Sequence, residues 1–173
     1  MSRRIARESA LQVMFQVDMA KVEHEQALEY IFAEFAVPES SQKFARFLIT
    51  GTLARLQEID QILQFASKEW NIDRMANVDR NIMRLAVFEL FYCPDIPGNV
   101  TVNEAIELAK TYSGEESGKF VNGILGGLLA RAGKSRDYKT EETLADEESM
   151  TAIGPVETTI QADIEPVSKG DLE

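Results

Sequence analysis

The start of the chain places arginines in line with an apolar and an aromatic residue. At about 100° per residue of an α-helix, Arg4, Arg7, Leu11 and Phe15 fall on one side, with Arg3 beside them. Arginine offers forked N–H donors to phosphate groups, and an aromatic ring offers a stacking surface to an unpaired base. This side therefore indicates RNA binding. The alternative is that Leu11 and Phe15 pack against another helical layer and the arginines are only solvated.

The apolar face of the same helix is expected to enter the core. It lies away from the arginines and comprises Ala6, Ala10, Val13, Met14 and Val17. The helix is thus predicted to be buried on this face and free on the arginine side.

A second basic and aromatic cluster follows near residue 120. Gly118, Lys119, Phe120 and Asn122 stand at the start of a predicted helix. Lys119 near a helix N-terminus could hold a phosphate while Phe120 stacks on a base. Phe120 also adjoins an apolar stripe of this helix, so core packing is the other interpretation.

The residues for catalysis or metal binding are missing from the sequence. It contains no glycine-rich phosphate loop, and its only cysteine and only histidine, Cys93 and His24, cannot form a zinc-ligand set or an internal disulfide. Glu104 and Glu107 have a spacing that solvated helix faces produce routinely. We therefore expect no enzyme, cofactor or metal site.

The charge of the chain is concentrated at its end. Residues 1–139 carry 17 Lys+Arg and 19 Asp+Glu, a net charge of −2, whereas residues 140–173 carry one Lys and ten acids, a net charge of −9. The overall −11 therefore does not exclude a local RNA-binding patch. Residues 137–173 lack aromatic residues after Tyr138 and lack a helical stripe, which predicts a disordered acidic tail after a domain of residues 1–136. This tail either adds solubility or competes with RNA for the basic patch.

The rest of the chain predicts an all-α fold, a compact bundle of about seven helices. No alternating β-branched run is long enough for a sheet, and no apolar run approaches the length of a membrane span. Together with a start that lacks the apolar centre of a secretion signal, this favours a cytoplasmic protein. Thr101 and Glu104 have the spacing of a capping box, which would open the sixth helix at Thr101. The expected helices span residues 4–20, 25–35, two between 39 and 66, 78–92, 101–112 and 116–132.

The predicted helix 78–92 is apolar on nearly all sides and should form the centre of the bundle. Glu89 lies one turn beyond Leu85 on an apolar face. A buried carboxylate is costly unless it is paired or hydrogen-bonded. Glu89 therefore either holds a neighbouring helix in register or meets a partner protein.

Taken together and in order, the motifs of residues 1–132 resemble the NusB family. Each motif is modest alone, but their order and spacing are specific. They are RRIARESALQ at 3–12, Trp70, VDR at 78–80, RLA at 84–86, EL at 89–90, DIP at 95–97, NEAIELAK at 103–110 and KFVNGIL at 119–125.

The resemblance implies two small helical bundles packed across each other. It also implies a transcription antitermination factor that pairs with the ribosomal protein NusE, binds the boxA element of nascent ribosomal RNA transcripts and acts on RNA polymerase. The residues that match the RNA-facing positions of the family are Arg3, Arg4, Arg7, Phe15, Lys119 and Phe120. Asp79 matches an acidic position on the partner-facing side, and Asp73 and Arg80 lie near it.

The sequence also departs from the family pattern. Phe15 stands where a tyrosine can occur, so the stacking face remains but a hydroxyl is lost. Gly126 and Gly127 replace residues that favour a helix more strongly, which predicts fraying of the last helix. The acidic tail does not belong to the family pattern. The rival function is a protein-interaction module or homodimer without an RNA role.

Overall fold

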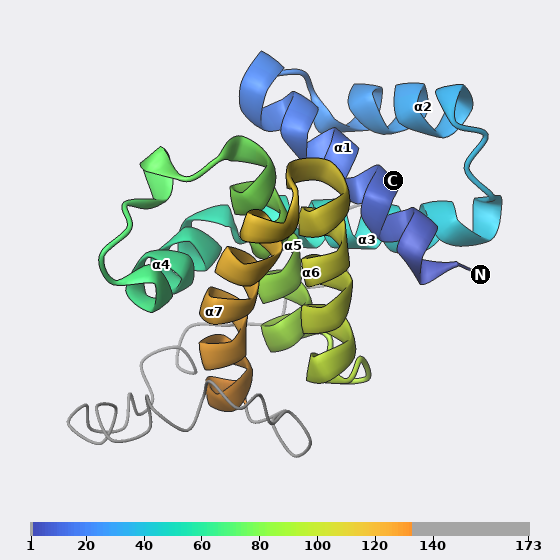
Figure 1. Ribbon diagram of the computed structural model, residues 1–173. Helices are drawn as coiled ribbons and strands as arrows, with labels where there is room; N and C mark the ends of the chain where they lie inside the picture. Colours follow the sequence, from blue (N-terminus) through green and yellow to red (C-terminus); the bar gives the residue numbers. More distant parts are fainter. Residues whose placement is uncertain (1, 133–173) are drawn as a thin grey trace, which may run out of the picture. The chain divides into compact units, whose positions relative to one another are not determined.

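The computed structural model describes residues 2–132, and within them the fold is all-α, as predicted (Figure 1). Residues 133–173 lie outside the described part, and with them the acidic tail expected at 137–173. No β-strand occurs in residues 2–132. The elements are α1 (Arg3–Ala20), α2 (His24–Glu34), α3 (Glu39–Ala54), α4 (Leu56–Ser67), the short 3₁₀ helix η1 (Ile72–Arg74), α5 (Asn77–Tyr92), α6 (Gly98–Ser113) and α7 (Glu115–Arg131).

Two groups of helices can be distinguished by the contacts that their members make. In the first group α1 packs against α2 and α3. In the second, α5 packs against α4, α6 and α7, and α6 runs beside α7 (Figure 1). Contacts of α5 with α1 and α3 join the groups. The two groups therefore share one hydrophobic core.

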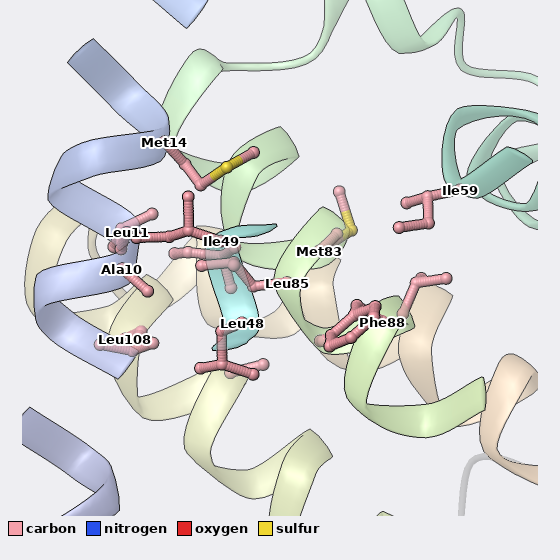
Figure 2. Packing of buried hydrophobic residues seen from close by; sticks show 14 of the residues in the cluster. Ala10, Leu11, Met14, Leu48, Ile49, Ile59, Met83, Leu85, Phe88 and Leu108 are labelled. Carbon is pink, nitrogen blue, oxygen red and sulfur yellow. The ribbon is translucent and has the colours of Figure 1, made fainter. Parts of the chain in front are cut away.

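The predicted central helix is α5. Every residue from 79 to 90 is buried, because other helices cover α5 on several sides. Figure 2 shows how its side chains meet those of its neighbours. The labelled residues are Met83, Leu85 and Phe88 of α5, Ala10, Leu11 and Met14 of α1, Leu48 and Ile49 of α3, Ile59 of α4 and Leu108 of α6.

A glycine allows α3 to approach α5 closely. A Cβ atom built on Gly51 of α3 would stand 2.0 Å from Cζ of Phe88. Such a separation is far inside van der Waals contact, so no side chain fits at Gly51 while Phe88 keeps its position. The lack of a side chain at Gly51 therefore lets α3 lie directly against the ring of Phe88 on α5.

Two local predictions differ from the structure. α6 begins at Gly98, with Pro97 as the cap residue, so Thr101 lies inside the helix and the predicted capping box was wrong. α7 runs without interruption through Gly126 and Gly127, although fraying was expected there. Burial of Leu125, Leu128 and other apolar residues of α7 offsets the cost of its glycines.

Among residues 2–132, no helix is long and apolar enough to span a membrane.

Candidate nucleic-acid interface

The first turn of α1 is ordered rather than frayed. The side chain of Ser2 caps the helix and accepts a hydrogen bond from the backbone N–H of Ile5 at 3.3 Å. The carbonyl of Ser2 also accepts one from the hydroxyl of Ser41 on α3 at 3.0 Å. Arg3 and Arg4 are thus the first two residues of a helix that is anchored to α3.

Arg4 is exposed and forms an ion pair with Glu104 of α6. Its Nε and Nη2 atoms donate to the two carboxylate oxygens at 3.0 and 2.9 Å. This hydrogen bonding, aided by the charge of Arg4, lowers the pKa of Glu104, although partial burial opposes the shift. The arginine is held in place on the surface, and a phosphate group would compete with Glu104 for the same donors.

Arg7 does not lie on a free surface, which corrects the expectation for this residue. It is only 5% exposed, and its Nε and Nη2 donate to Oε1 and Oε2 of Glu89 at 2.7 and 2.8 Å. The hydroxyl of Thr101 also donates to Oε2 of Glu89, at 2.9 Å. Leu11 is likewise buried. The reason is that α1 contacts α2, α3 and α5, so more than one of its faces is covered.

These bonds decide between the two interpretations of Glu89 in favour of a structural role. The residue is 2% exposed and joins α5 to α1 and α6. Thr101 and Glu104, read from the sequence as a capping pair, instead bind Glu89 and Arg4 across helix boundaries.

Phe15 lies at the edge of a hollow between α1, α2 and the end of α6. The hollow has a volume of about 490 Å³, and Phe15 itself is 39% exposed. Three further exposed aromatic residues line it, namely Tyr30, Phe35 and Tyr112. Sequence reasoning missed these three. Tyr30 and Phe35 could have been noticed as large aromatic residues off the apolar stripe of the second helix.

Lys119 and Phe120 lie in the second turn of α7. Lys119 is exposed and pairs with Glu116 at 3.1 Å. Phe120 is half-buried, with its ring edge-on to Trp70 at 5.8 Å between centroids. Tyr112, which lines the hollow beside Phe15, precedes the first residue of α7 by three positions. Lys119 and Phe120 themselves do not line the hollow.

Of the three residues expected to face a partner protein, only Asp73 is exposed. Asp79 is 4% exposed, and its Oδ2 accepts a hydrogen bond from Ser117 of α7 at 3.0 Å. Asp79 is therefore a buried residue that contacts α7, and its expected contact with a partner protein stays a prediction. Asp79→Lys would place a cation in the core. This substitution would therefore test stability rather than an interface.

Arg80 is also a structural residue. It is 9% exposed, and its Nη2 donates to Asp18 of α1 at 2.7 Å and to Asn77 at 2.8 Å. Burial alone would raise the pKa of Asp18, but hydrogen bonds from Arg80 and Asn81 outweigh it and lower that pKa. Arg80 thus ties α5 to α1.

Comparison with known proteins identifies the family of this chain. The NusB family model matches residues 4–130. The transcription antitermination protein NusB of Pelotomaculum thermopropionicum is 54% identical over 129 residues, which cover 75% of this chain and 90% of the relative. The corresponding protein of Heliobacterium modesticaldum is 46% identical over 167 residues, covering 96% and 80%.

Solved structures of NusB proteins share the fold. T. maritima NusB matches with a TM-score of 0.70 and 36% identity, over 84% of this chain and 98% of that one. NusB from a complex of the antitermination factors NusB and NusE with dsRNA matches with a TM-score of 0.69 and 28% identity, over 75% and 96%. Since the family model covers nearly all the described residues and relatives reach 54% identity, the chain belongs to the NusB family.

Proposed function

We propose that this protein is a transcription antitermination factor that binds boxA-type RNA of nascent ribosomal transcripts together with NusE. The observation that carries the proposal is the match to the NusB chain of a NusB–NusE–dsRNA complex, which covers 96% of that chain. The RNA-bound pair would act on RNA polymerase in the cytoplasm, without catalysis by this chain.

The surface residues supply the chemistry that the proposal needs. Arg3, Arg4 and Lys119 present cations, and Phe15 presents a ring beside a hollow of other aromatic residues. Cations bind the phosphates and aromatic rings stack on unpaired bases. Arg7 contributes indirectly to this surface. Its buried ion pair with Glu89 holds α1, which carries Arg3, Arg4 and Phe15, against α5.

The RNA prediction concerns the two arginines at the start of α1, Arg3, which is partly buried, and Arg4, which is exposed. We expect Arg3→Ala with Arg4→Ala to weaken binding of a boxA-type RNA by about ten-fold or more, because charge-assisted contacts to phosphate are lost. The slope of log K against log salt should fall by about 0.7 for each lost contact to a single strand. Fluorescence anisotropy across a salt series measures both quantities.

Two further variants make this test specific. Arg131→Ala removes a cation from the far end of α7 and should leave RNA affinity nearly unchanged. Glu104→Gln should raise the affinity, because it frees Arg4 from a competing carboxylate. Wild-type affinity in the double arginine variant would place the RNA elsewhere. A protein that binds no RNA but forms a homodimer or binds NusE would instead be a protein-interaction module.

The partner prediction concerns Asp73, the exposed member of the expected partner-facing set. We expect Asp73→Lys to slow association with NusE several-fold at low salt, since reversal of a rim charge acts mainly on the association rate. Thermal stability should not change. Surface plasmon resonance with immobilised NusE, at low and high salt, measures the effect. Asp95→Lys, an equal charge change in the exposed loop before α6, is the control; equal rates for both variants would move the interface away from η1.

A further inference from the structure

A row of aromatic rings crosses from α3 to α5. Phe44 stacks on Phe47 with 6.3 Å between ring centroids, and Phe47 meets Phe88 edge-on at 5.4 Å. Phe88 stacks on Tyr92 at 5.5 Å. These four residues are called the aromatic row below. Phe47 is 50% exposed, so its ring lies over the buried Phe88 and presents one side to solvent.

A cation stands at each end of the aromatic row. The guanidinium carbon of Arg3 is 5.1 Å from the ring centroid of Phe44, and that of Arg55 is 4.5 Å from the ring of Tyr92. Lys43, next to Phe44 on α3, is exposed and adds a third positive charge. This is the combination of stacking surface and flanking cations with which proteins bind single-stranded nucleic acid.

Glu58 places a carboxylate beside Tyr92 at one end of the row. Burial, together with a hydrogen bond to Glu58 and the charge of that carboxylate, raises the pKa of Tyr92 to about 12. The phenol therefore stays neutral at physiological pH. Arg55 and the carboxylate of Glu58 are the charged groups at this end of the row, and the guanidinium of Arg55 is the one that attracts a phosphate group.

We propose that the aromatic row is a second RNA-binding surface, which takes an unpaired segment that flanks the boxA-type element. The inference rests on the proposed function and extends it. Arg3 belongs to both surfaces, since it is in the first turn of α1 and also lies over Phe44. RNA that reaches the start of α1 can thus continue along α3, with a base on Phe47 and phosphates near Arg55.

The charges favour RNA over a protein as the occupant. Interfaces between proteins also use exposed aromatic and arginine residues. Here the cations stand at the two ends of the row with rings between them, and the row is continuous with the proposed RNA site through Arg3. A flexible polyanion with stackable bases satisfies both features at once.

The experiment compares two RNAs on the full chain. The first is a boxA-type single strand, and the second is the same strand extended by unpaired nucleotides at both ends. We expect the extension to raise the affinity of the wild-type protein about five-fold or more, as stacking of one base would. Phe47→Ala should abolish this gain without changing affinity for the short RNA, and Phe47→Tyr should restore it. Arg55→Ala should reduce the salt dependence for the long RNA only.

Phe65→Ala is the matched control. Phe65 of α4 is 47% exposed and lies under Arg131 at 4.6 Å, so it has the same chemistry outside the aromatic row. The gain from the extension should persist in this variant. Thermal melts confirm that each variant is folded before binding is compared.

The outcomes separate the two proposals. Absence of binding to either RNA by the wild-type protein, both alone and together with NusE, rejects the proposed function itself. Binding of the short RNA without a gain from the extension, or a gain that survives Phe47→Ala, rejects only the second surface. Loss of NusE affinity in Phe47→Ala with unchanged RNA binding would also overturn it, because the row would then be a protein-docking site.

Discussion

Replacement of Arg7 by alanine is expected to lower the free energy of unfolding by about 3–5 kcal/mol, the cost of breaking a buried ion pair from one side. The carboxylate of Glu89, which is 2% exposed in the native fold, would lose both bonds from the guanidinium. The hydroxyl of Thr101 donates to Oε2 but cannot supply the lost charge. Urea unfolding followed by circular dichroism measures the loss.

Two comparisons show whether the loss of stability in Arg7→Ala comes from the carboxylate of Glu89, which no longer has its arginine partner. Arg4→Ala removes a surface arginine whose pair with Glu104 is open to solvent, and we expect little change in stability. Replacing both members of the buried pair by methionine should recover most of the loss, because no uncompensated charge remains. Equal, small losses in Arg7→Ala and Arg4→Ala would contradict the buried pairing.

The second large effect is expected at two glycines, where the same substitution should act in opposite directions. Gly51→Ala places a Cβ atom 2.0 Å from Cζ and 2.4 Å from Cε2 of Phe88. Phe88 is held between Phe47 and Tyr92, so its ring cannot move freely aside. We expect a destabilisation of about 1–3 kcal/mol, the usual cost of overpacking a core.

Gly127→Ala is the matched counterpart. No atom lies within 4 Å of a Cβ built at this position of α7. The helix propensity of alanine should therefore stabilise the protein by up to about 1 kcal/mol. Parallel thermal melts of the two variants show whether each melting temperature rises or falls relative to the wild-type protein. A melting temperature of Gly51→Ala at or above that of the wild-type protein would show that α3 and α5 do not approach as closely as described.

Much of the fold follows from local sequence patterns. Periodic apolar residues and the prolines after Tyr92 predicted the helices to within about three residues at their described ends, the start of α6 being the largest error. The nearly continuous apolar character of residues 78–92 also predicted that α5 is central. These properties are recoverable from sequence because backbone hydrogen bonding and amphipathic spacing act within one helix.

The order of motifs determined the family as well. Residues 3–12, 103–110 and 119–125 carry the resemblance, and the family match covers 4–130. Exposure of Arg4, Phe15 and Lys119 was expected from the same patterns and is present in the structure. Their contact with RNA remains a prediction.

Only the tertiary structure decided which polar residues are buried. Helical spacing placed Arg7 in line with Arg4, but it could not indicate that Arg7 meets Glu89, 82 positions away. Thr101 and Glu104 have the spacing of a cap, yet each binds a residue on another helix. A helical pattern defines which residues share a face, whereas the number of neighbours that cover the face depends on packing between distant segments. The aromatic row arises in the same way, because its rings come from α3 and α5 and meet only when Gly51 lets the two helices approach.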